Sequence, residues 1–288
     1  MLPLISLAMT VAALGAPPAT LTGRWLPPLE ATGALDGRVV RGLVQAYVPA
    51  ACGDAARRCP LLVALHGWDH TPAMFASESG LAALAEADGV VVAIPDTGRS
   101  VFETAFHPQT KSRWKKAPGA RWVGEVVMPW LRAHLPVSGA ARDTAIVGYS
   151  TGGRGAFVVA QRYADFGFVG SVSGTFDLLA LAPKTGEHRI HAAILGPLKA
   201  HAARWRADDV VASGLMGKLA GLHVYAGHGD ADKVVPVGQL ASLKRALGDV
   251  AVASGTFVVT EGGGHDWALW NVHWGPMFEA FARARRGG

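Results

Sequence analysis

The sequence predicts an α/β fold in which a mostly parallel central sheet is covered by helices on both faces. Short apolar runs without polar alternation recur along the chain, which is typical of strands buried on both faces. Segments with helical spacing separate these runs, and that order favours parallel strands joined by crossover helices. Because 50% of the 288 residues are hydrophobic and 17% are charged, the chain can bury a large core.

The expected elements follow one another from residue 38 onward. Residues 38–49 alternate and are rich in valine, which indicates an edge strand or a hairpin. Residues 60–65 and 89–94 are continuous apolar runs and are expected to be buried strands, with a helix over 74–88 between them. Residues 122–135 have the amphipathic spacing of a helix.

The second half of the chain continues the alternation. Residues 144–147 predict a strand and 154–160 a helix, with a glycine-rich turn between them. Three more strands and a closing helix complete the expected order, at 166–173, 222–226, 256–260 and 267–284.

Residues 174–221 are longer than an ordinary connection between two strands and contain helix-like pieces such as 190–205. We expect an insertion over the carboxyl edge of the sheet that could act as a small cap. Ordinary covering helices are the alternative.

Composition divides the chain into three parts. Residues 1–16 are apolar, lack acidic residues and end in small residues, which indicates a signal peptide and a secreted or periplasmic protein. No Lys or Arg precedes this run, so a buried N-terminal segment or a wrongly assigned start are the alternatives. The run is too short for stable membrane insertion. Residues 17–37 are expected to be an extended lead-in to one domain over 38–288.

Cys52 and Cys59 are the two cysteines of the chain. Because they lie close together in a chain expected to be exported, they predict one disulfide that closes a surface loop. Two thiols alone make a poor metal site, and we expect neither a metal ion nor an organic cofactor.

The formal net charge is +5, and the basic residues are scattered except at 111–116 and 283–286. A nucleic-acid-binding protein normally gathers its basic residues on one face. We therefore expect a solvated basic surface and no nucleic-acid partner.

Residues 148–153 read Gly-Tyr-Ser-Thr-Gly-Gly between the predicted strand and helix. This is the context of a nucleophile elbow, in which a serine occupies a tight and strained turn. The hydroxyl of Ser150 would lie at the carboxyl edge of the sheet, beside the positive end of a helix, an arrangement suited to acyl transfer. A glycine-rich turn without a catalytic role is the alternative.

A serine nucleophile needs a base and a group that orients the base. His265 ends a glycine-rich loop after the last predicted strand and is the candidate base. Asp232 lies in the loop after the strand at 222–226 and is the preferred acid, with Asp230 as the alternative. Either carboxylate could instead be a turn residue.

The transition state of acyl transfer also needs hydrogen-bond donors for its oxyanion. The backbone amide of Trp68, after the strand at 60–65, could supply one donor and that of Thr151 the other. Trp68, Trp114, Trp267 and Trp270 could line an apolar or aromatic acyl site, or could fill the core.

These motifs resemble the α/β-hydrolase superfamily, most of all the esterase D and feruloyl-esterase type, with polyhydroxyalkanoate depolymerases nearby. The resemblance covers about 38–281. The segments that carry it are 65–67, 122–129, 148–153, 232–236 and 264–267, with Trp270.

The resemblance implies a serine hydrolase that cleaves small or polymeric carboxylic esters through an acyl-enzyme, without a cofactor. Ser150 would be the nucleophile, Asp232 the acid and His265 the base, with the amides of Trp68 and Thr151 as the oxyanion hole. Thr151 departs from the methionine usual in this group, which changes the wall of the acyl pocket. A peptidase, a thioesterase or a catalytically silent binding protein on the same fold are the alternatives.

Overall fold

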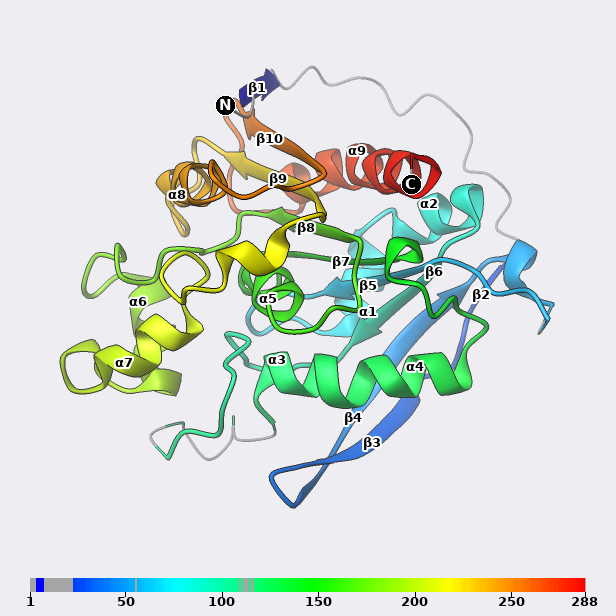
Figure 1. Ribbon diagram of the computed structural model, residues 1–288, viewed down its shortest axis with the longest axis horizontal. Helices are drawn as coiled ribbons and strands as arrows, with labels where there is room; N and C mark the ends of the chain where they lie inside the picture. The colour runs from blue at the N-terminus through cyan, green and yellow to red at the C-terminus, as the bar shows by residue number, and fades with distance from the viewer. Residues whose placement is uncertain are drawn as a thin grey trace.

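The computed structural model describes residues 4–7, 23–54, 56–108, 110, 114 and 117–287. A ten-stranded sheet forms its centre (Figure 1). The strands are β1 (Leu4–Leu7), β2 (Arg24–Trp25), β3 (Leu29–Leu35), β4 (Arg38–Val48), β5 (Leu61–Leu65), β6 (Val91–Pro95), β7 (Thr144–Tyr149), β8 (Phe168–Val172), β9 (His223–Gly229) and β10 (Ser254–Thr260).

The strands lie in the order β1-β10-β9-β8-β7-β5-β6-β4-β2, and β3 pairs with β4. Every pair from β1 to β6 is parallel, whereas β4 is antiparallel to β6, β2 and β3. This confirms the predicted mostly parallel sheet. Because β5, β7, β9 and β10 are parallel, the loops that follow them meet at one edge of the sheet.

Helices cover both faces of the sheet, as predicted (Figure 1). The α-helices are α1 (Pro72–Glu78), α2 (Leu81–Asp88), α3 (Gly119–Arg121), α4 (Met128–His134), α5 (Thr151–Ala160), α6 (Gly186–Leu195), α7 (Leu198–Asp208), α8 (Gly238–Ala246) and α9 (Trp267–Arg286). A π-helical segment, η3 (Trp122–Val127), joins α3 to α4.

Successive residues of each central strand enter opposite cores. In β5, Leu61, Val63 and Leu65 pack with α5, α8 and the α3–α4 helix. Leu62 and Ala64 pack on the other face with α1, α2 and α9. The alternation of a pleated strand thus explains why the buried runs have no polar side.

The helix predicted over 74–88 is two helices in the structure. Ser79 has extended backbone angles and ends α1, and Gly80 begins the next helix, α2. The Ser79 hydroxyl donates to the carbonyl oxygen of Phe75, which satisfies an acceptor at the end of α1. A serine–glycine pair in the middle of an apolar pattern therefore interrupts the helix.

Three segments before residue 38 join the sheet: β1, β3 and the short β2, which pairs with β4. β3 lies within the expected lead-in and pairs along its length with β4. β1 lies within the expected signal peptide and pairs in parallel with β10. The rest of that expected signal peptide lies outside the described residues.

The segment 174–221 contains α6 and α7, which lie together at one end of the molecule (Figure 1). Its buried residues Leu178, Leu181, Ile194 and Trp205 form a small apolar core together with Val101, and Trp68 and Trp114 pack against this core. The break between the two helices is at Gly196, whose positive φ ends α6. A single helix over the predicted 190–205 is therefore not formed.

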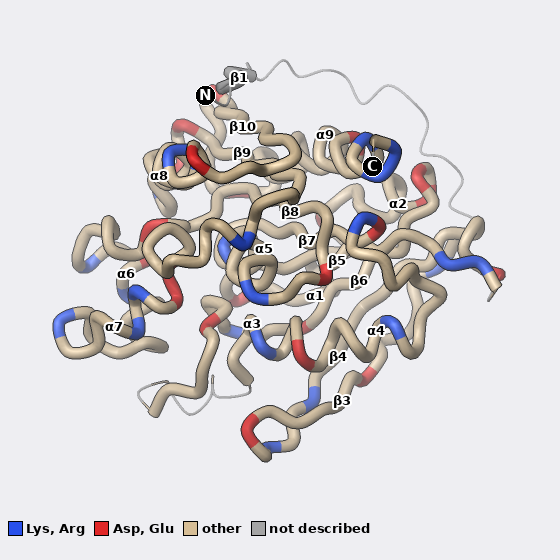
Figure 2. The backbone as a smooth tube through the Cα atoms, viewed as in Figure 1, with Lys and Arg blue, Asp and Glu red and all other residues tan. Residues whose placement is uncertain are grey.

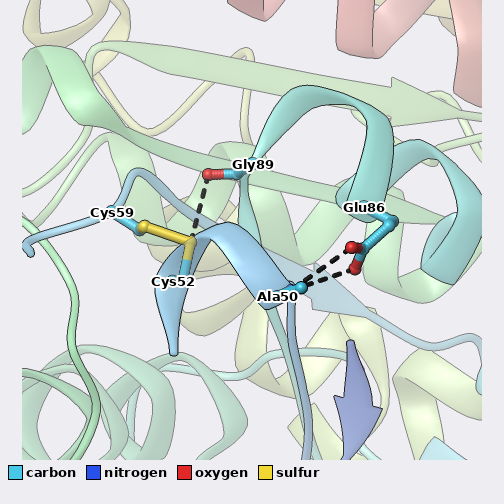
Figure 3. The surroundings of a disulfide bond; sticks show 5 residues. All are labelled: Ala50, Cys52, Cys59, Glu86 and Gly89. Atoms are coloured by element: carbon cyan, nitrogen blue, oxygen red, sulfur yellow. Dashed lines mark hydrogen bonds between the residues drawn. A yellow bond between two sulfur atoms is a disulfide. The ribbon is translucent and has the colours of Figure 1, made fainter. Parts of the chain in front are cut away.

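The expected disulfide joins Cys52 to Cys59 (Figure 3). Both cysteines are buried, and backbone hydrogen bonds connect Cys59 to Pro136 and Ser138. Close by, the carboxylate of Glu86 accepts hydrogen bonds from the amide of Ala50 (Figure 3). The disulfide thus holds the loop before β5 against neighbouring elements.

Lys and Arg residues are spread over helices and loops around the molecule (Figure 2). Within the described part of the chain, no helix combines the length and apolar character needed to cross a bilayer.

Removing the disulfide should destabilise the fold without changing the loops at the carboxyl edge of the sheet. We expect Cys52→Ala/Cys59→Ala to lower the free energy of unfolding by about 2–3 kcal/mol, because the closed loop is short. Urea denaturation measures this change. A reductant should destabilise the wild type by the same amount and leave the double variant unaffected. Equal stability of the two proteins would contradict a stabilising role.

Candidate active site

The turn at Ser150 is the sharpest feature at the edge of the sheet. It joins β7 directly to α5, and Ser150 has φ 55° and ψ −127°, an unusual conformation for a residue with a side chain. A Cβ on Gly152 would overlap the carbonyl oxygen of Leu65, and a Cβ on Gly148 would overlap the backbone of Gly152. Glycine is therefore required on both sides of the turn.

Three side chains from separate loops form one hydrogen-bonded chain. The Oγ of Ser150 lies 3.0 Å from Nε2 of His265, and Nδ1 of His265 lies 2.7 Å from Oδ2 of Asp232. The imidazole donates from Nδ1 to the carboxylate, which leaves Nε2 free to accept the serine proton. Ser150 and Asp232 are buried, so bulk water screens this chain poorly.

Asp232 is fixed by its own loop as well as by His265. Its Oδ1 accepts hydrogen bonds of 2.8 Å from the amides of Val234 and Val235. Burial would raise its pKa, but Nε2 of His228, 3.5 Å from Oδ2, and the bonded His265 hold the pKa of Asp232 below its usual value. The carboxylate therefore stays ionised at neutral pH.

Asp230, the alternative acid, makes its hydrogen bond to Gly262 and not to His265. Its side chain is exposed, and Oδ1 accepts a 2.7 Å hydrogen bond from the amide of Gly262. It therefore joins the loop after β9 to the loop after β10, whereas Asp232 contacts the histidine.

The candidate oxyanion residues lie on either side of Ser150. Thr151 is the first residue of α5 and is buried. Trp68 follows Gly67, whose backbone lies against the side chain of Ser150 so closely that a Cβ there would be 3.3 Å from the serine Cβ. Two loops thus converge on the serine.

His66 holds the loop that carries Trp68. The buried imidazole donates from Nδ1 to the carbonyl oxygen of Gly67 at 2.9 Å and accepts at Nε2 from the amide of Thr97 at 3.2 Å. Burial lowers the pKa of His66, so the ring is neutral, as this pair of hydrogen bonds requires. The His66-Gly67 pair is recognisable in the sequence, but the two hydrogen bonds by which His66 holds the loop are not predicted by it.

A pocket of about 300 Å³ opens at Ser150 and His265. Its aromatic wall is formed by Trp68, His70, Tyr149 and Trp270, and its remaining lining residues are Gly67, Gly186, Glu187, Ile190 and Val234. The hydroxyl of Tyr149 lies 2.7 Å from Nδ1 of His70, so these two polar groups satisfy each other.

The four tryptophans that could line the site take different places. Trp68 and Trp270 line the pocket. Trp114 packs edge-on against Trp68 at 5.1 Å, and Trp267 packs against Trp270 at 5.0 Å. Trp68 and Trp270 therefore contact the pocket directly, and Trp114 and Trp267 pack behind them.

Sequence reasoning missed part of the pocket wall. His70, Tyr149, Glu187, Ile190 and Val234 come from four separate segments. Tyr149 precedes Ser150 in the sequence, and Val234 follows Asp232 by two residues, so their sequence positions could have indicated them. Glu187 and Ile190 come from α6, and no local sequence motif predicts that they line the pocket.

The described residues contain no group of His, Cys, Asp and Glu side chains arranged to hold a metal ion.

Residues 41–281 match the model of the Esterase family, described as "Putative esterase". The chain belongs to the Esterase family. It is a carboxylic ester hydrolase. The resemblance to the α/β-hydrolase superfamily is confirmed in its fold. No curated protein matches this esterase significantly in sequence.

Solved structures share the fold of this esterase at low sequence identity. S-formylglutathione hydrolase from Agrobacterium tumefaciens is 16% identical with a TM-score of 0.72 over 90% of this chain and 99% of its own. Fluorophosphonate-binding serine hydrolase F of Staphylococcus aureus is 16% identical, with a TM-score of 0.68 over 90% and 98%. The ferulic acid esterase of Anaeromyces mucronatus is 15% identical, with a TM-score of 0.62 over 90% and 92%.

Beneath the elbow, a buried arginine ties α5 to two other segments of the esterase. Arg154 is fully buried one turn after Ser150, and its amide donates to the Ser150 carbonyl at 3.1 Å. Its guanidinium donates to the carbonyl oxygens of Val101 and Asp208. The helix that follows Ser150 is thereby joined to the end of α7.

A buried carboxyl group lies near this arginine. Glu103 is 4% exposed, and its Oε2 accepts a 2.7 Å hydrogen bond from the hydroxyl of Ser100. Burial raises the pKa of Glu103 to about 7, against the opposing effects of that hydrogen bond and of Arg154. Ionising this group in the folded protein is therefore costly.

We expect Glu103 to make the stability of the esterase fall as the pH rises. Its stabilising contribution is complete below its unfolded pKa and is lost between about pH 4.5 and 7, by about 3 kcal/mol at most. Glu103→Gln should remove that part of the pH dependence.

Urea denaturation from pH 5 to 8 measures the difference between wild type and Glu103→Gln. Glu30→Gln, at an exposed position, is the matched control and should follow the wild-type curve. Parallel curves for wild type and Glu103→Gln would rule out a buried ionisation at this site.

Proposed function

We propose that Ser150, His265 and Asp232 are the catalytic triad of this esterase and that it acts through an acyl-enzyme. The observation that carries the proposal is the continuous hydrogen-bonded chain from the serine Oγ through both imidazole nitrogens to a carboxylate. Such a chain activates a serine that would otherwise be a poor nucleophile.

In the first half of the reaction, His265 accepts the proton of Ser150 as the serine oxygen attacks the ester carbonyl. Asp232 stabilises the imidazolium that forms and holds the ring in one tautomer. His265 then gives the proton to the leaving alcohol, and the acyl group stays on Ser150. In the second half, His265 takes a proton from water as the water oxygen attacks the acyl carbon. The bond between that carbon and the Ser150 oxygen then breaks, and His265 returns the proton to this oxygen, which releases the acid and restores the serine.

The amides of Trp68 and Thr151 are proposed as the oxyanion hole. Three features support them: the position of Thr151 at the start of α5, the contact of Gly67 with Ser150, and the two hydrogen bonds of His66. Donors held in place before the reaction stabilise the developing charge without having to reorganise.

The segment 174–221 is proposed to act as a small cap, because Gly186, Glu187 and Ile190 of α6 complete the pocket wall. We also propose that the esterase works in the periplasm or outside the cell, where a disulfide persists. Esters small enough to enter the pocket, or the exposed ends of polymeric ones, are the proposed substrates.

Ser150→Ala should lower kcat for 4-nitrophenyl esters by at least about 10⁴-fold, because it removes the nucleophile. A panel from acetate to long acyl chains, assayed with wild type and variant, measures the loss and sizes the acyl pocket. The melting temperature should not fall, since the strain at this position does not depend on the hydroxyl. Equal rates in the two proteins would exclude Ser150 as the nucleophile.

Two carboxylates in one loop allow a matched test of the acid. Asp232→Asn should lower kcat by about 10³–10⁴-fold, because the imidazole loses its ionised partner. Asp230→Asn should lower it less than about tenfold, because Asp230 contacts Gly262 and not His265. Steady-state rates on one short-chain ester are sufficient, and the reverse order of effects would assign the acid to Asp230.

A further inference from the structure

A second and larger cavity, of about 660 Å³, lies beside the catalytic pocket. Its walls come from the loop before α6, the start of α6, the loop after β9 and the start of α8. We call it the side cavity. The catalytic triad does not use it, and no motif in the sequence pointed to it.

The side cavity and the catalytic pocket share part of their walls. Gly186, Glu187 and Val234 line both spaces. Val234 is 47% exposed and follows Asp232 by two residues, and its amide donates to that carboxylate. The two spaces are therefore adjacent, and a substrate whose ester bond lies at Ser150 would reach the side cavity by passing these three residues.

The lining of the side cavity is apolar inside and basic at its rim. Leu181, Val234 and Pro236 supply apolar surface, whereas Lys184, Arg189 and Lys233 are exposed cations. None of these three cations forms an ion pair with another residue in the described part of the chain. Three cations without acidic partners at one opening favour an anionic ligand.

The start of α6 adds to this positive potential. Gly186, the first residue of the helix, lines the side cavity, and Thr185 caps the helix by accepting a hydrogen bond from the amide of His188. The remaining amides of the first turn carry the positive end of the helix dipole. The start of α6 and the three basic side chains therefore both make the electrostatic potential of the side cavity more positive.

Glu187 is the one acidic residue among the described residues that line the side cavity. It is 4% exposed, and its Oε2 accepts a 2.7 Å hydrogen bond from the hydroxyl of Thr175. Burial raises the pKa of Glu187, which disfavours its negative charge. Glu187 lies buried where the two spaces meet, whereas the three cations are exposed at the rim.

We propose that the side cavity binds a carboxylate group of the substrate, so that this esterase prefers esters in which an apolar spacer separates the ester bond from a carboxylate. The spacer lies on Leu181, Val234 and Pro236, and the carboxylate meets Lys184, Arg189 and Lys233. This inference rests on the proposed function, because it places the ester bond at Ser150.

Two pairs of substrates test the proposal and locate the carboxylate. In the first pair the acyl part ends in a carboxylate or in an uncharged amide: the mono-4-nitrophenyl ester of adipic acid and that of its monoamide. In the second pair the alcohol part differs in the same way: the butyryl esters of 6-hydroxyhexanoate and of 6-hydroxyhexanamide. Each amide matches its carboxylate in length and carries no second ester bond.

In one of the two pairs, kcat/KM of the wild type should be about tenfold higher for the carboxylate at low salt, as expected for two or three exposed ion pairs acting together. The ratio should fall towards one in 0.5 M NaCl, because salt screens exposed charges. Lys184→Gln/Arg189→Gln should also reduce it, to about two- to threefold, because Lys233 remains. Lys218→Gln, an exposed lysine outside the lining of the side cavity, should leave it unchanged.

The outcomes separate this inference from the proposed function. If the wild type hydrolyses the amide substrates and Ser150→Ala does not, but neither pair shows a preference for the carboxylate, the side-cavity proposal is wrong and the triad stands. A preference that keeps its full size both at high salt and in Lys184→Gln/Arg189→Gln would equally overturn it. If Ser150→Ala cleaves the ester bond of the amide-bearing substrates as fast as the wild type does, the proposed function itself is wrong.

Discussion

The close passage of three backbone segments at the elbow is the constraint on which the rest of the site depends. β5, β7 and α5 meet where Gly148 and Gly152 leave no room for a Cβ. At this contact Ser150 has φ 55° and ψ −127°, and its hydroxyl lies at the sheet edge, 3.0 Å from Nε2 of His265. The surrounding fold must supply the energy that holds such a conformation, and the two cores on the faces of the sheet provide it.

Electrostatics around the elbow follow from burial. Asp232 keeps its charge in a buried place because backbone amides and histidines face it. Glu103 and Glu187 are buried with fewer such partners, and both pKa values are raised. The same environment therefore holds one carboxyl ionised and favours the neutral form of two others, according to the donors that each one meets.

The central strands and the loops of Ser150, Asp232 and His265 could be predicted because each has a strong local signal. Continuous apolar runs mark strands buried on both faces, and glycines mark the tight loops. β3 could not be predicted as a strand, because its alanines and glycine have little β-propensity and its pairing with β4 forms it. Glu187 and Ile190 reach the site through tertiary packing of α6, which no local pattern records.

The hydrogen-bonded chain at the site joins residues that are far apart in sequence: Ser150 and His265 are 115 positions apart. Contacts of such long range form late, after the closure of large loops. β9 and β10 must both have joined the sheet before an imidazole can reach the serine. Under the proposed mechanism, a chain still emerging from the ribosome therefore carries an inert serine, and hydrolytic competence appears only when the last strand and its loop have been synthesised and docked.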